Sequence, residues 1–163
     1  MRPSSKHLTA QVIEAKPEGD RVLASAHSSE LKEFGWKGSC GNIPAAYLTG
    51  LLAGLRARSE GISKTVLDIG LHAMSPSSRI FAATKGALDG GLSIPHDKAA
   101  LPSLERTQGK HVASYSQTLS SEPEAYKRAF SAYLRHKLKP EDLQNHFADV
   151  QAKINASLPE ARE

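Results

Sequence analysis

The chain has 163 residues, of which 39% are hydrophobic and 23% are charged, and its formal net charge at pH 7 is +4. This length suits one domain with an extension, and it can bury a core without disulfide bonds. The single cysteine excludes an intramolecular disulfide and a cysteine-rich zinc site. The sequence has no apolar run long enough to span a membrane and no secretory signal, so we expect a cytoplasmic protein. Its mildly basic charge permits a nucleic-acid partner but does not require one.

The first predicted elements are two strands that pair as an antiparallel hairpin. Apolar residues alternate with polar ones in 7–14, which predicts a half-buried strand, and 21–27 has the same character. Pro17 and Gly19 lie between them and favour a turn, because proline fixes φ and glycine tolerates positive φ. One short helical turn is expected at 29–33.

A glycine-rich loop at 35–42 leads into the longest helix that we predict in the first half of the chain. Asn42 is suited to cap the N-terminus of this helix, and Pro44 suits its first turn. The helix is expected to end near Arg58. Four leucines recur at the spacing of one buried helix face: Leu48, Leu51, Leu52 and Leu55.

The next elements predict a sheet that is partly parallel. Residues 65–71 form a continuous apolar run with one acid, Asp68, which is typical of a strand covered by helices. A helix follows at 78–88, so a strand–helix–strand crossover is expected. Gly50 and Gly54 lower the helix propensity of the preceding helix, and we expect them where that helix presses closely on the sheet.

The last third of the chain is predicted to be helical. After a loop at 92–102, a short helix is expected at 109–119, and the segment 121–124 starts another, with Pro123 near its first turn. The apolar face of this second helix comprises five residues: Tyr126, Phe130, Tyr133, Leu134 and Leu138. The last helix is expected to begin at 139–142, and four residues form its apolar stripe: Leu143, Phe147, Val150 and Ile154.

These elements predict an α/β fold, in which a mixed sheet is flanked by helices. We expect an α/β core at 1–100 and a helical C-terminal extension at 101–163. No internal repeat and no low-complexity tract divides the chain further.

The sequence contains no strong catalytic or metal-binding motif. Its seven histidines form no recognised metal-ligand pair, and no nucleophile elbow is present. The loop at 35–42 lacks the sequence of a nucleotide-binding P-loop, although its glycines and Lys37 suit a phosphate of a polymer. Asp68, together with Glu14 or Asp89, leaves an RNase-H-like or nucleotide-using α/β enzyme open as the alternative function.

Seven segments of the chain are similar, in the same order, to one protein family: 2–12, 35–42, 44–54, 66–71, 85–96, 130–134 and 140–143. The strongest similarity lies in the runs GWKGSCGN, PAAYLTGLLAG and KGALDGGLSIPH. In these segments the chain resembles the 5S-rRNA-binding large-subunit ribosomal proteins of the L-eighteen family, in their archaeal–eukaryotic form. Several long matches in register are more specific than any short motif in this sequence.

The resemblance implies a structural constituent of the large ribosomal subunit, and not an enzyme. Members of the family sit in the central protuberance, where they bind 5S rRNA and help to attach it to large-subunit rRNA and to neighbouring ribosomal proteins. Their core is a mixed sheet with helices, described as a ribosomal-protein or RNase-H-like motif. The basic N-terminal arm and the first strand of the family are not found before Arg2, and Ser5 stands where an asparagine is common.

On this resemblance we expect RNA contacts at ten residues. Six are predicted near 5S rRNA: Arg2, Lys6, His7, His27, Trp36 and Lys37. Four are predicted against large-subunit rRNA: Lys127, Arg128, Arg135 and Lys137. No catalytic residue, metal, cofactor, small-molecule substrate or membrane partner is expected, and most of the affinity should come from neutralising phosphates.

Overall fold

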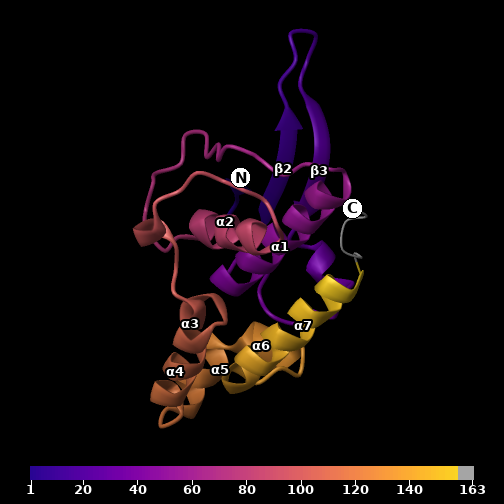
Figure 1. Cartoon of the computed structure of the whole chain (residues 1–163). Helices are drawn as coiled ribbons and strands as arrows, with labels where there is room; N and C mark the ends of the chain where they lie inside the picture. Colours follow the sequence, from indigo (N-terminus) through magenta and orange to yellow (C-terminus); the bar gives the residue numbers. More distant parts are fainter. Residues whose placement is uncertain (158–163) are drawn as a thin grey trace.

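The computed structural model describes residues 1–157, which form a three-stranded sheet with helices packed against it (Figure 1). The strands are β1 (Arg2–Pro3), β2 (Leu8–Glu14) and β3 (Arg21–His27), in that order across the sheet. Both strand pairs are antiparallel, which confirms the predicted hairpin. The far end of the β2–β3 hairpin extends beyond the helices (Figure 1).

The two long strands are buried only in the half that lies near the helices. Four of their side chains belong to the core: Leu8, Ala10, Ala24 and Ala26. The pairing register shifts between Val12 and Ile13, and beyond the shift Ile13 lies opposite Val22. Both of these side chains are about half exposed, so the hairpin leaves the core at this point.

Helix α1 (Ile43–Ser59) begins and ends close to where the sequence predicts. The side chain of Asn42 accepts a hydrogen bond from the backbone N–H of Ala45 at 2.9 Å, and Pro44 lies in the first turn, as predicted. Every residue from Pro44 to Gly54 is buried. The leucine face is therefore only part of the packing surface, because neighbouring elements cover this helix on all sides.

Glycines allow α1 to pack directly against the backbone of helix α2 (Arg79–Asp89). A Cβ atom on Gly50 would overlap the carbonyl group of Ala83, and one on Gly86 would overlap the carbonyl group of Tyr47. The contact is reciprocal, because each helix supplies a glycine that admits the other backbone. The close contact that the sequence predicts against a sheet is thus made against a helix, and that detail of the prediction is wrong.

The predicted strand at 65–71 is also wrong. This segment lacks regular secondary structure, and the nearest β-bridge is an isolated parallel one between Lys64, just before it, and Ser93. Val66 is 84% exposed, as expected of a segment that no helix covers. The sheet of the described residues is antiparallel throughout, so the predicted crossover into a parallel strand does not form and the predicted mixed sheet is wrong.

The remaining helical elements connect or follow those above: η1 (Glu30–Lys32), η2 (Lys98–Ala100), α3 (Leu104–Thr107), α4 (Lys110–Leu119), α5 (Pro123–Ala129), α6 (Ser131–Arg135), η3 (Pro140–Asp142) and α7 (Leu143–Ser157). The helix expected from 121 onward is divided at Phe130, whose φ of −107° and ψ of 18° are not helical. Leu134 is consequently 38% exposed, although the sequence places it on a buried face. None of the helices in residues 1–157 is long and apolar enough to cross a membrane.

Helix α7 completes the core of the N-terminal elements. Its predicted apolar stripe is confirmed, since four residues are buried: Leu143, Phe147, Val150 and Ile154. They belong to the same hydrophobic cluster as Leu8 of β2 and Leu48 of α1. The core therefore continues across the boundary that we predict between 100 and 101.

Candidate nucleic-acid interface

The turn between β1 and β2 presents Lys6 to solvent on a fixed backbone. The backbone N–H of Ser4 donates to the carbonyl oxygen of His7 at 2.8 Å, and the backbone N–H of His7 donates to Oγ of Ser4 at 3.0 Å. These reciprocal bonds close the turn on both sides of Lys6, whose side chain is exposed. The lysine is thus held at the tip of an ordered turn.

The glycine-rich loop at 35–42 packs against this turn. A Cβ atom on Gly41 would lie 2.9 Å from the carbonyl oxygen of Lys6, so only glycine allows the close approach. Arg79, in the first turn of α2, donates from Nη1 to the carbonyl oxygens of Ser4 at 2.7 Å and Gly41 at 3.2 Å. The turn and the loop therefore form one surface, which we call the turn–loop surface (residues 4–7 and 35–42).

His7 and His27 lie side by side at the edge of the turn–loop surface. Their ring centroids are 4.9 Å apart, and the rings are tilted by 32°. Nδ1 of His7 is 3.1 Å from Oγ of Ser28, and Nδ1 of His27 is 2.6 Å from Oγ of Ser29. Because each serine fixes one ring nitrogen, Nε2 of each histidine is left for another partner.

Trp36 anchors the loop and presents little surface to a ligand. Its side chain is buried in the hydrophobic core, with the residue only 3% exposed, and the indole N–H donates to the carbonyl oxygen of Ser39 at 3.2 Å. The ring stacks on His146 of α7, with centroids 5.2 Å apart. The indole is therefore a packing anchor, and it offers almost no exposed ring surface on which a base could stack. Lys37, the next residue, is exposed.

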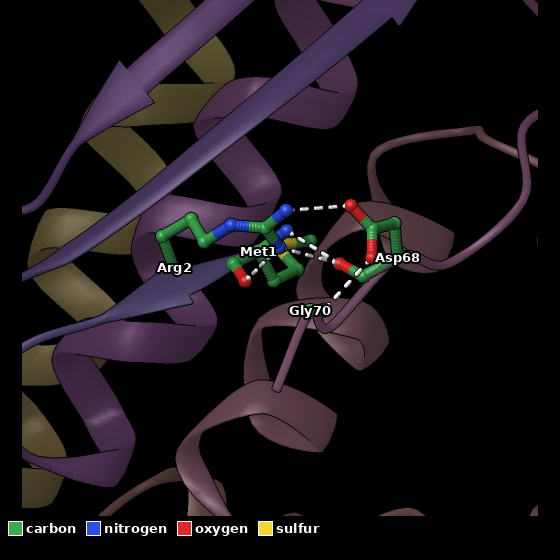
Figure 2. Close-up of polar contacts among 4 residues, drawn as sticks. All are labelled: Met1, Arg2, Asp68 and Gly70. Carbon is green, nitrogen blue, oxygen red and sulfur yellow. Dashed lines mark hydrogen bonds and ion pairs between the residues drawn. The ribbon is translucent and has the colours of Figure 1, made fainter. Parts of the chain in front are cut away.

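Arg2 is engaged within the protein (Figure 2). Its Nη2 atom lies 2.6 Å from Oδ2 of Asp68, and Nη1 donates to the carbonyl oxygen of Asp68 at 3.3 Å. The hydrogen bond from Arg2, and then one from the backbone N–H of Gly70, lowers the pKa of the Asp68 carboxyl. A phosphate near Arg2 must therefore compete with a carboxylate that is already ionised.

The acids of the alternative enzyme hypothesis are not assembled. Asp68 is exposed and paired with Arg2, Glu14 pairs with Lys16 at 3.2 Å, and Asp89 accepts a hydrogen bond from the hydroxyl of Tyr47 at 2.6 Å. Among residues 1–157, no group of three or more histidine, cysteine, aspartate or glutamate side chains is arranged to hold a metal ion.

The four predicted cations of the extension are exposed and lie on α5, on α6 and in the turn after α6. Lys127 and Arg128 lie in the last turn of α5, where they line the same hollow. Arg135 ends α6, and Lys137 follows it in a left-handed backbone conformation with a φ of 55°. Left-handed lysine is uncommon and marks a sharp turn of the chain.

Sequence reasoning missed Arg79 and His146, both of which position the turn–loop surface. Arg79 has a detectable signal, because a cation in the first turn of a helix opposes the helix dipole and needs a specific partner. His146 accepts a hydrogen bond at Nε2 from the backbone N–H of Lys37 at 3.0 Å. Nothing in the sequence around His146 points to this contact, which joins residues far apart in the chain.

The chain is similar to known large-subunit ribosomal proteins along most of its length. The family described as "Ribosomal large subunit proteins 60S L5, and 50S L18" matches residues 1–65 and 57–97. The large ribosomal subunit protein uL18 of Caldivirga maquilingensis is 49% identical over 156 residues, which cover 94% of this chain and 75% of that protein. The uL18 protein of Aeropyrum pernix is 48% identical over 165 residues, covering 100% of this chain and 77% of that protein.

Proposed function

The chain belongs to the family of large-subunit ribosomal proteins described as 60S L5 and 50S L18, and we propose that it binds 5S rRNA and attaches it to large-subunit rRNA. As a member of this family it is a structural component of the large subunit of cytoplasmic ribosomes. The proposal specifies the RNA that the chain binds and the surfaces that bind it. It also gives the chain a position beside neighbouring proteins in the central protuberance.

The turn–loop surface is the observation that carries the 5S rRNA proposal. It brings Lys6 and Lys37 onto two segments that Arg79 ties together, and its glycines let the backbone approach a phosphate closely. Affinity for RNA comes largely from cations that neutralise phosphates and release counterions. Two lysines on a preorganised backbone suit this role, because little conformational entropy is lost on binding.

The histidine pair extends this surface toward ribose and base edges. RNA duplexes are recognised mainly through phosphates and 2′-hydroxyls in the shallow groove. Nε2 of His7 and Nε2 of His27 have no hydrogen-bond partner among the described residues, and an imidazole nitrogen can exchange a hydrogen bond with a 2′-hydroxyl. Trp36 contributes indirectly, because it anchors the loop that carries Lys37.

The extension is proposed to contact large-subunit rRNA. Four exposed cations support this role: Lys127, Arg128, Arg135 and Lys137. In Figure 1 helix α5, which carries Lys127 and Arg128, lies at the opposite end of the molecule from the far end of the β2–β3 hairpin. The extension also contacts the turn–loop surface, because Nδ2 of Asn42 donates to the hydroxyl of Tyr133 in α6 at 3.1 Å. It therefore supplies cations beyond those of the turn–loop surface.

A gel-shift experiment with 5S rRNA tests the proposal. We expect the chain to prefer 5S rRNA over a scrambled RNA of the same length, with an affinity that falls steeply as salt rises. The double variant Lys6→Ala/Lys37→Ala should flatten the slope of log affinity against log salt by about 2, or about 1 for each lost phosphate contact. The charge-matched control Lys64→Ala/Lys98→Ala, which removes exposed lysines elsewhere, should retain the slope. Equal slopes for the two double variants would contradict the proposal.

A further inference from the structure

An open hollow of about 840 Å³ lies between helices α4 and α5. Tyr115 and Leu119 line it from α4, and Glu124, Lys127 and Arg128 line it from α5. Its volume is in the range of sites that hold a small ligand or a single nucleotide. The hollow is thus large enough to be a binding site, and its residues indicate what it binds.

Tyr115 presents an aromatic ring to the hollow. The residue is 54% exposed, which is unusual for a large aromatic side chain. The ring is packed at an angle of 61° against buried Phe130, with centroids 6.0 Å apart. The contact supports the ring on one side while more than half of the residue remains accessible. An exposed ring of this kind is suited to stack on a nucleobase.

Two cations flank this ring. Nζ of Lys127 is 3.5 Å from Oε1 of Glu124, and both side chains are largely exposed. An exposed pair at this distance contributes little stability, so Lys127 can exchange the carboxylate for a phosphate. Arg128 forms no ion pair with any residue in the part of the chain that the structure describes. The hollow therefore combines an aromatic surface with two available positive charges.

We propose that this hollow binds one unpaired nucleotide of large-subunit rRNA, whose base stacks on Tyr115 and whose phosphate contacts Lys127 and Arg128. The inference rests on the proposed function and deepens it, because it names the form of RNA recognised at one site. A base inside a duplex is stacked on both faces and offers no ring surface to Tyr115. The site therefore selects a bulged or looped nucleotide.

Binding of a short single-stranded RNA to the full chain tests the assignment. The probes are fluorescently labelled hexa-adenylate and a blunt RNA duplex with the same number of phosphates, and anisotropy measures binding. We expect hexa-adenylate to bind more tightly than the duplex. Replacing Tyr115 by leucine should weaken hexa-adenylate binding by about 5-fold to about 150-fold, the range expected for one lost stacking contact. Tyr115→Phe should retain the affinity, because it keeps the ring.

Substitution of the two cations, Lys127 and Arg128, gives a second test of the site. Lys127→Ala/Arg128→Ala should lower the salt slope for hexa-adenylate by about 1.4, while Lys64→Ala/Lys98→Ala should not. Ultraviolet crosslinking of the wild-type chain should attach hexa-adenylate within 110–129. Thermal unfolding of each variant shows whether a loss of binding reflects a loss of fold.

Two results overturn the inference. They are equal hexa-adenylate affinity for the wild type and a folded Tyr115→Leu variant, and a crosslink that lies outside 110–129. If the proposed function holds but this inference fails, Tyr115→Leu binds both 5S rRNA and hexa-adenylate as the wild type does. If the proposed function itself fails, the wild type shows no preference for 5S rRNA, whatever the result with hexa-adenylate.

Discussion

The backbone N–H of Lys37 donates a hydrogen bond to Nε2 of His146 at 3.0 Å, across 109 positions of the chain. The bond requires a neutral imidazole, because Nε2 must accept. Burial, with Lys37 and Lys153 nearby, lowers the pKa of His146 from its ordinary value of 6.5, and Asp149 opposes this shift. The last helix thus holds the glycine-rich loop through an imidazole whose pKa in the folded chain lies below its ordinary value.

Stability should therefore decrease in mildly acidic solution. The unfolded chain takes up a proton on His146 as the pH falls through about 6.5, while the folded chain resists protonation until a lower pH. The unfolded state then binds more protons, so the free energy of unfolding falls as the pH decreases below about 6.5. Urea unfolding from pH 8 to about pH 5 measures this. His146→Gln keeps a hydrogen-bond acceptor without titrating, so it should show a weaker pH dependence.

A second histidine, His111, also contributes to the pH dependence of stability in this experiment. Burial, and then Arg106, also lowers the pKa of His111, so its contribution has the same sign. The prediction concerns the difference between the wild type and His146→Gln, since His111 is common to both. If the urea midpoint of His146→Gln depends on pH as strongly as that of the wild type, protonation of His146 does not cause the loss of stability.

Alanine at Gly50 or Gly86 should destabilise the protein strongly. The added methyl group would meet a backbone carbonyl of the other helix, which cannot move as a side chain can. Overpacking of this kind costs about 1–3 kcal/mol or more, and it outweighs the helix propensity of about 1 kcal/mol that alanine gains over glycine. Urea unfolding should show a net loss of stability for each variant. Ala152→Gly, at an exposed position of α7, measures the free-energy difference between alanine and glycine that comes from helix propensity alone.

Asn42→Ala should cost about 1–2 kcal/mol of unfolding free energy, because it removes the cap of α1. Nδ2 of Asn42 also donates to the hydroxyl of Tyr133 at 3.1 Å, so the variant breaks a link to α6 as well. Asn42→Asp keeps the capping oxygen and loses only the donor, and it should be the milder change. A double-mutant cycle with Tyr133→Phe isolates the link, and full additivity of the two changes would argue against it.

Asp68→Asn distinguishes the RNA-binding function from the enzyme alternative. If Arg2 lies near 5S rRNA, removing the competing carboxylate should strengthen binding and steepen the salt dependence by about 1. The enzyme hypothesis predicts the loss of a metal-dependent activity instead. Gel shifts across a salt series, beside a nuclease assay with and without added magnesium, measure both outcomes. Arg2→Ala is the paired control, because without Arg2 the substitution at Asp68 should not change RNA binding.

The sequence predicts best those elements whose signal is local. Asn42 and Pro44 mark the start of α1 because capping depends on residues within one turn. The stripe from Leu143 to Ile154 predicts α7 because helical spacing alone places these residues on one face. The β2–β3 hairpin is predicted for the same kind of reason, since alternation and turn residues lie within about twenty positions.

The predictions that fail depend on distant partners. The run at 65–71 has the composition of a buried strand, but a strand needs a neighbour, and Lys64 bridges only to Ser93. In the candidate site, the sequence identifies the exposed lysines Lys6 and Lys37 but not the contacts that join their segments. Those contacts come from Arg79 and His146, whose partners are set by tertiary packing.

The position of α7 in the core also has a consequence for biosynthesis. Phe147 and Ile154 fill space between elements that the ribosome produces first, so a nascent chain lacking them has an open apolar interior. The loop that carries Lys37 has no hydrogen-bond acceptor at His146 until the same helix emerges. Newly made molecules therefore acquire a finished binding face only after α7 has emerged, which delays capture of their RNA until that helix has been made.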